Sequence, residues 1–114
     1  MIEDLVAKTC TPCRGGVPPL TAAEARAYQE KVPGWTLLDD TTRISRTYRF
    51  RNFADAFEFV QRVAAAAEEE GHHPDVAFGW GYATVSLQTK KIKGLHENDF
   101  IMAAKFDRLC GATA

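Results

Sequence analysis

Residues 52–71 read NFADAFEFVQRVAAAAEEEG and hold the longest apolar repeat of the chain. Their apolar side chains recur at helical spacing, which is typical of an amphipathic helix with one buried face. Asn52 can cap the first turn through its side-chain oxygen, and Gly71 suits the left-handed position that ends a helix. The side chains expected in the core are Phe53, Ala56, Phe57, Val60, Val63, Ala64 and Ala67.

Strand and helix patterns lie on both sides of this helix. Alternation of apolar and polar residues, bounded by turn residues such as Gly, Pro and Asp, predicts short strands. A capping box over Thr21–Glu24 predicts a further helix, and residues 90–95 are expected to form a loop. The expected elements are a helix over 22–31, strands over 35–38 and 43–50, the long helix, strands ending near Phe78 and over 82–89, and a helix over 98–109.

This element order, αββαββα, indicates the fold class. Strands linked as hairpins form antiparallel sheets, and amphipathic helices must cover an apolar face. We therefore expect an α+β fold with a four-stranded antiparallel sheet and helices packed on one face. Residues 1–20 are rich in Gly and Pro and are expected to form an irregular N-terminal arm, whereas residues 21–114 form a single domain.

The composition excludes several classes of protein. Of the 114 residues, 46% are hydrophobic and 25% are charged, with a net charge of −1. A chain without a basic excess is a poor phosphate binder, so we expect no nucleic-acid partner. No apolar run is long enough to span a bilayer, and the first residues do not read as a signal peptide. We therefore expect a cytoplasmic protein with no membrane contact.

The cysteines do not indicate a metal site. Cys10-Thr-Pro-Cys13 is half of a zinc or redox motif, with Cys110 and His96 as the distant candidates for its other half. Three cysteines are too few for a disulfide scaffold. His96 otherwise reads as a surface histidine at the start of a helix. No metal is expected, and the role of the cysteine pair stays open.

Two adjacent histidines, His72 and His73, directly follow the long helix. Imidazole both donates and accepts protons near neutral pH, so the pair suits general acid–base catalysis. Pro74 favours an extended backbone at His73 and so fixes the direction in which the chain leaves the helix. From these residues alone, a solvated pair of histidines in a turn remains the alternative.

A wider set of residues around this pair resembles the pterin-4a-carbinolamine dehydratase family. It comprises Glu68-x-x-x-His72-His73-Pro74, Trp80 and Gly94-Leu95-x-Glu97-Asn98-Asp99-Phe100, and the resemblance covers about residues 20–110. It implies the same fold and the dehydration of 4a-hydroxytetrahydropterin to quinonoid dihydropterin in tetrahydropterin recycling. It also implies that no metal or cofactor is needed, because the tetrahydropterin is the substrate.

The resemblance assigns roles to individual residues. Asp99 is implied as an acidic pocket residue, although a carboxylate in the first turn of a helix can equally be a cap. At Lys90 the chain departs from the family, which usually has histidine or tryptophan there. An ammonium group is a poor base near pH 7, but it can supply positive charge beside a leaving hydroxyl. The implied catalytic residues are His72, His73 and Asp99, and the implied substrate-binding residues are Glu68, Trp80 and Lys90. For Trp80, a packing role in the fold is the alternative.

The departure at Lys90 keeps a second function open. Some family members are dimerisation cofactors of a transcription factor, and dehydratase-like proteins of carboxysome-bearing bacteria resemble RuBisCO assembly factors. The alternative is therefore a weak or inactive dehydratase-like protein that binds or assembles a protein partner, for example a RuBisCO assembly factor in the carboxysome. In either case we expect a homo-oligomer, because short sheets leave unpaired edges that another subunit can cap. The resemblance implies a homodimer or a homotetramer.

Overall fold

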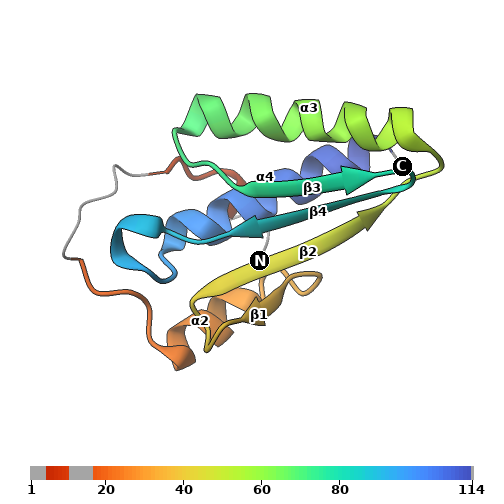
Figure 1. Ribbon diagram of the computed structural model, residues 1–114. Helices are drawn as coiled ribbons and strands as arrows, with labels where there is room; N and C mark the ends of the chain where they lie inside the picture. Colours follow the sequence, from red (N-terminus) through yellow and green to blue (C-terminus); the bar gives the residue numbers. More distant parts are fainter. Residues whose placement is uncertain (1–4, 11–16, 114) are drawn as a thin grey trace.

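Figure 1 shows the computed structural model, in which helices cover one face of a four-stranded antiparallel sheet. The structure describes residues 5–10 and 17–113. The strands are β1 (Thr36–Leu38), β2 (Arg43–Arg49), β3 (Asp75–Gly79) and β4 (Tyr82–Leu87), in the sheet order β1-β2-β4-β3. The helices are α2 (Ala22–Gln29), α3 (Phe53–Glu70) and α4 (Glu97–Thr113), with the 3-10 helix η1 (Lys90–Ile92) after β4. The predicted α+β class and the order αββαββα are confirmed.

The two faces of the sheet differ in polarity. Ala83, Val85 and Leu87 of β4 alternate into the buried face, as the sequence predicts for a half-buried strand. On the opposite face the hydroxyl groups of Thr47 and Thr84 lie 2.9 Å apart across β2 and β4. The helices therefore lie on the apolar face, and within the described residues none of them is long and apolar enough to cross a membrane.

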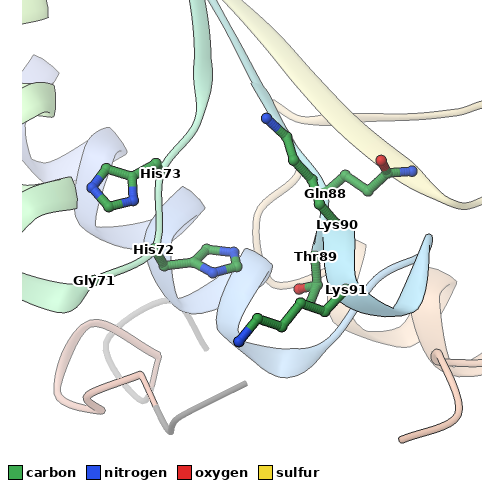
Figure 2. A pocket seen from close by; sticks show the side chains of 7 residues that line it. All are labelled: Gly71, His72, His73, Gln88, Thr89, Lys90 and Lys91. Atoms are coloured by element: carbon green, nitrogen blue, oxygen red, sulfur yellow. The ribbon is translucent and has the colours of Figure 1, made fainter. Parts of the chain in front are cut away.

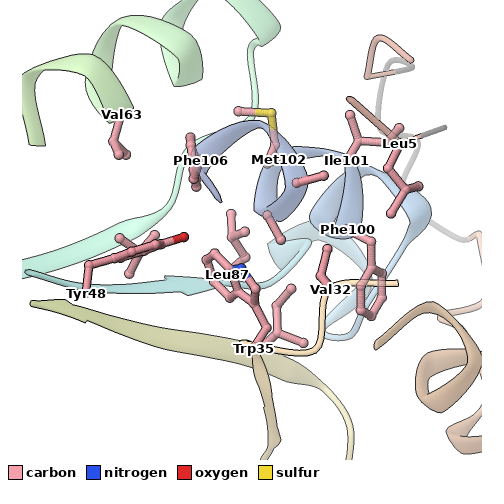
Figure 3. Close-up of a cluster of buried hydrophobic side chains, with 14 of the residues drawn as sticks. Leu5, Val32, Trp35, Tyr48, Val63, Leu87, Phe100, Ile101, Met102 and Phe106 are labelled. Carbon is pink, nitrogen blue, oxygen red and sulfur yellow. The ribbon is translucent and has the colours of Figure 1, made fainter. Parts of the chain in front are cut away.

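The core lies between the apolar face of the sheet and helices α3 and α4 (Figure 3). At its edge lies a largely shielded carboxylate, Asp107, whose Oδ1 accepts hydrogen bonds from Trp35 Nε1 at 3.0 Å and from the Tyr48 hydroxyl at 2.5 Å. Arg46 supplies a third donor at 3.0 Å. Burial and this carboxylate raise the pKa of Tyr48 well above its usual range. The large buried side chains of the core include Trp35, Tyr48, Phe59, Leu87, Phe100 and Phe106.

Both ends of α3 are as the sequence predicts. The Asn52 side-chain oxygen accepts a hydrogen bond from the Asp55 N–H at 2.8 Å, which satisfies one of the free amide groups of the first turn. Gly71 ends the helix with φ +68°, a conformation that costs little only without a Cβ. The helix therefore stops one residue before the histidines and delivers them at a defined point.

The apolar stripe predicted for α3 is partly wrong. Phe53 and Phe57 are 48% and 45% exposed and pack on Phe78 of β3, with ring centroids 5.5 and 5.9 Å apart. Phe59, which the prediction omitted, is fully buried. The helix carries apolar residues on two neighbouring faces, so periodicity alone does not distinguish the face that meets the sheet. The buried side chains of α3 are Ala56, Phe59, Val63 and Ala67.

The described N-terminal residues contact both α3 and α4. The backbone N–H of Cys10 donates to the Glu70 carboxylate at the end of α3 at 2.8 Å. Lys105 of α4 lies 3.7 Å from the same carboxylate and donates to the Val6 carbonyl at 3.0 Å. These contacts connect the end of the helix that precedes the histidines to the neighbouring helix.

Candidate active site

The end of α3 delivers both histidines to a cleft. Beyond Gly71 the backbone turns sharply toward β3, and the His72 N–H still donates to the Ala67 carbonyl at 3.2 Å. The cleft has a volume of about 390 Å³, which is large enough for a small-molecule ligand. Figure 2 shows the histidines on one side and the segment after β4 on the other. The lining residues are Gly71, His72, His73, Gln88, Thr89, Lys90 and Lys91.

His72 and Asp99 form a shielded pair at this cleft. Nε2 of His72 lies 2.7 Å from Oδ1 of Asp99, and the two side chains are 10% and 0% exposed. An ionised carboxylate only accepts hydrogen bonds, so Nε2 carries the proton. In the neutral ring, Nδ1 is then left as the proton acceptor. Asp99 therefore fixes both the tautomer and the orientation of the imidazole.

The second oxygen of Asp99 caps α4. Oδ2 accepts hydrogen bonds from the His96 N–H at 3.0 Å and from the Thr89 hydroxyl at 2.8 Å. Nδ1 of His96 accepts in turn from the Asn98 N–H at 3.1 Å, which completes a reciprocal cap of the first turn. The two alternatives for Asp99 are therefore compatible, because one oxygen caps the helix while the other holds His72. His96 is a half-buried capping residue.

His73 and Glu68 form a second, exposed pair. Nε2 of His73 is hydrogen-bonded to the Glu68 carboxylate, with side chains that are 59% and 76% exposed. Water screens such a pair strongly, so it restrains the ring less than Asp99 restrains His72. The outer side of His73 also contributes to an apolar groove between α3 and β3, whose lining includes Val60 and Val76. The adjacent histidines thus occupy different environments.

Lys90 and Trp80 lie at opposite ends of β4. Lys90 begins η1 and lines the cleft, and its ammonium group is 3.5 Å from the Asp75 carboxylate. Trp80 lies in the β3–β4 turn, is 72% exposed and is not among the residues that line the cleft. A strand of six residues separates the two positions by about 20 Å. The cleft thus joins both histidines and Lys90, with Asp99 and Glu68 behind them, but it leaves out Trp80.

Thr89 belongs to the site but was not predicted from the sequence. This residue is 2% exposed and supplies the hydroxyl that holds Asp99 from the side of β4. The signal was present, because Thr89 follows Leu87 by two residues and so continues the buried face of the strand. A buried hydroxyl needs a hydrogen-bond partner, which makes a polar residue on that face worth singling out.

Cys10, the described cysteine of the predicted motif, is not among the residues that line the cleft. Burial and the neighbouring Glu70 carboxylate raise the pKa of the Cys10 thiol to about 12, so the thiol is protonated near neutral pH. Cys13 lies outside the described residues. Within residues 5–10 and 17–113, no group of three or more His, Cys, Asp or Glu side chains is arranged to hold a metal ion.

Comparison with known proteins gives a consistent family match. Residues 18–109 match the family described as pterin 4 alpha carbinolamine dehydratase. A protein of Cupriavidus pinatubonensis named "Putative pterin-4-alpha-carbinolamine dehydratase 1" is 62% identical over 109 residues, which are 96% of this chain and 94% of that protein. A relative from Azoarcus sp., named "Putative pterin-4-alpha-carbinolamine dehydratase", is 57% identical over 111 residues, which are 97% of this chain and 95% of that protein.

Two solved structures share the fold. A transcriptional coactivator/pterin dehydratase from Brucella melitensis is 31% identical, with a TM-score of 0.77 over 82% of this chain and 99% of that one. A pterin dehydratase-like protein described as a RuBisCO assembly factor in the alpha-carboxysome is 26% identical, with a TM-score of 0.60 over 68% of this chain and 90% of its own. The fold is therefore shared by proteins with two different described roles.

Proposed function

The chain belongs to the pterin 4 alpha carbinolamine dehydratase family, and from this premise we propose that it dehydrates a 4a-hydroxytetrahydropterin to the quinonoid dihydropterin. The observation that carries the proposal is the shielded His72–Asp99 pair in the wall of a cleft of suitable size. Dehydration breaks the C4a–O bond, removes the N5 proton and forms a C4a=N5 double bond. It therefore needs one group that takes a proton and one that gives a proton.

His72 is suited to act as the base. Its Nε2–H is held by the Asp99 carboxylate, so Nδ1 of the neutral ring is available to take the N5 proton. The carboxylate then stabilises the imidazolium that forms, because the pair is shielded from water. The fixed ring orientation lowers the entropic cost of reaching the transition state.

His73 is suited to act as the acid. In its protonated form the ring can donate to the departing C4a hydroxyl, so that the leaving group is water. Its exposure lets it recover a proton from solvent after each turnover, while the Glu68 carboxylate contacts its Nε2. Lys90 adds positive charge on the opposite wall of the cleft. The reaction changes no oxidation state, so the proposed step needs no oxidant or reductant. In this proposal the histidines carry both proton transfers, no metal or cofactor takes part, and the pterin is the substrate.

The test is the rate of carbinolamine dehydration with the purified protein. The carbinolamine is generated in the presence of the protein, and quinonoid dihydropterin is followed by stopped-flow absorbance against buffer alone. We expect His72→Ala and His73→Ala each to lower the catalysed rate about a hundredfold to ten-thousandfold, as is usual for a general acid or base. Circular dichroism checks that both variants are folded. A wild-type protein that does not exceed buffer would contradict the proposal.

An assembly role is the second candidate, and an exposed apolar surface favours it. Phe53 and Phe57 on α3 and Val76 on β3 are 48%, 45% and 37% exposed, which is unusual for large apolar side chains that lie together. In a binding protein this surface would meet the partner, and in an oligomeric enzyme it would meet a second copy. Phe53→Ser/Phe57→Ser tests both: size-exclusion chromatography reports loss of the oligomer, and affinity capture from host extract reports loss of a partner.

A further inference from the structure

We propose that Thr89 is a positioning residue for the dehydration: its hydroxyl holds the Asp99 carboxylate in the orientation that presents one oxygen to His72. The inference rests on the proposed function and deepens it, because it concerns how the proposed base is prepared for proton transfer. Thr89 acts through Asp99 and does not act on the pterin itself.

The Asp99 carboxylate is held from two parts of the fold. Within the described residues it accepts three hydrogen bonds, one at Oδ1 from His72 and two at Oδ2 from the His96 N–H and the Thr89 hydroxyl. The His96 N–H belongs to the turn that begins α4, so it moves together with Asp99. Thr89 instead follows β4, and Figure 2 shows its side chain on the wall of the cleft opposite His72. The hydroxyl therefore fixes the carboxylate relative to the sheet.

The backbone of Thr89 is itself held in place. Its N–H donates to the Gly94 carbonyl at 2.9 Å, and its carbonyl accepts from the Ile92 N–H at 3.2 Å. Gly94 packs closely on Pro19, since a Cβ added to Gly94 would lie 2.5 Å from the Pro19 Cβ. A donor with an anchored backbone holds its acceptor in one geometry, which lowers the entropic cost of an ordered site.

Burial makes the loss of this hydroxyl consequential. The Asp99 side chain is 0% exposed, so water has little access to replace a missing donor at Oδ2. The torsion of a carboxylate about its last single bond has broad minima, so a carboxylate with one donor fewer can rotate. Oδ1 then moves away from Nε2 of His72, and the Nδ1–H tautomer of the ring becomes populated. In that tautomer the atom proposed to take the N5 proton already carries one.

Two variants separate the hydroxyl from the packing of the side chain. Thr89→Val removes the hydroxyl with little change in shape, whereas Thr89→Ser keeps the hydroxyl and removes the methyl group. In the stopped-flow dehydration assay, Thr89→Val should lower kcat about tenfold to a hundredfold and leave KM within about twofold, because a misplaced base slows the reaction without weakening binding. Thr89→Ser should keep kcat within about threefold of wild type.

Two-dimensional ¹⁵N–¹H NMR of the histidine rings gives a readout that does not depend on turnover. We expect the Nε2–H tautomer of His72 in the wild-type protein and in Thr89→Ser, and a mixture of both tautomers in Thr89→Val. Thr84→Val is the matched control, because it removes a threonine hydroxyl from the opposite face of β4, where it contacts Thr47 at 2.9 Å. This control should keep both the rate and the tautomer. If Thr89→Val does not fold by circular dichroism, Thr89→Ala replaces it with the same expected mixture.

The outcomes separate this inference from the proposed function. A His72 ring that keeps the Nε2–H tautomer without the Thr89 hydroxyl would overturn the inference. Equal losses of rate in Thr89→Ser and Thr89→Val would overturn it as well, because they would assign the effect to packing. A wild-type rate no greater than that of buffer would overturn the proposed function, and the tautomers would still decide whether Thr89 orients the pair.

Discussion

Asp99→Asn is expected to change the tautomer of His72 while the fold is kept. In the wild-type protein, Oδ2 of Asp99 accepts from the His96 N–H and the Thr89 hydroxyl, and Oδ1 accepts from His72. The His96 N–H can only donate, so the single oxygen of the introduced amide must take the Oδ2 position. The NH₂ group of that amide then faces Nε2 of His72, which has to become an acceptor. The ring proton moves to Nδ1, and the proposed base is lost.

The size of the effect follows from these contacts. Two of the three hydrogen bonds persist with a neutral acceptor, and one charge-assisted hydrogen bond is replaced by a neutral one. The free energy of unfolding should therefore fall by about 1.5–3 kcal/mol, the usual contribution of a hydrogen bond to a charged group. The dehydration rate should fall about a hundredfold to ten-thousandfold, the range for a lost general base.

Asp107→Asn is the matched control. Asp107 is also a shielded carboxylate with three donors, but it lies eight residues further along α4, about 12 Å from Asp99. Urea unfolding should show a similar loss of stability in both variants, whereas stopped-flow absorbance should show a loss of rate only for Asp99→Asn. Two-dimensional ¹⁵N–¹H NMR of the histidine rings reports the tautomer directly. A full rate in Asp99→Asn, or a lowered rate with the proton still on Nε2, would contradict the proposed role of Asp99 in fixing the tautomer of His72.

Three further predictions test burial and placement. The first concerns a variant in which Cys10 is the one remaining cysteine. Its thiol should react with iodoacetamide at pH 8 at least about tenfold more slowly than a free thiol. The reason is that a pKa raised to about 12 leaves little of the reactive thiolate at this pH. The rate should rise as the pH approaches that value. Phe59→Ala should cost about 3–5 kcal/mol in urea unfolding, and the exposed Phe57→Ala much less. Trp80→Ala should keep the dehydration rate within about twofold of wild type, and a large loss would place Trp80 at the site after all.

The parts of the fold that depend on local rules were predictable from the sequence. The Asn52 cap, the Gly71 end and the alternation over β4 are each determined by a few neighbouring residues. The buried face of α3 was not, because Phe53 and Phe59 are equally apolar and lie on different faces of the same helix. Only contact with the sheet decides which of them is covered, and that contact is made by residues far away in the chain.

The same distinction between local patterns and contacts distant in the chain applies to the candidate site. The adjacent histidines stand out in the sequence, because two imidazoles at a helix end are an uncommon combination. The pairing of His72 with Asp99 spans 27 residues, and that of Thr89 with Asp99 spans 10. Neither pairing can be predicted from a local sequence pattern, because the partners are far apart along the chain. Lys90 and Trp80 lie far apart because the six residues of β4 separate them. The resemblance implies that both bind substrate, because it compares positions in the sequence and contains no information on distances in space.

The adjacency of the two histidines itself supports different roles for them. Successive side chains of an extended backbone point to opposite sides, and Pro74 favours that conformation at His73. When one ring reaches the buried Asp99, the next is therefore directed toward solvent and Glu68. A base benefits from a fixed ring and a shielded partner, whereas an acid that must be recharged after each turnover benefits from water. Two adjacent residues of an extended backbone meet both conditions, because one side chain is buried and the next is exposed. Two histidines on the same face of a helix would share one environment.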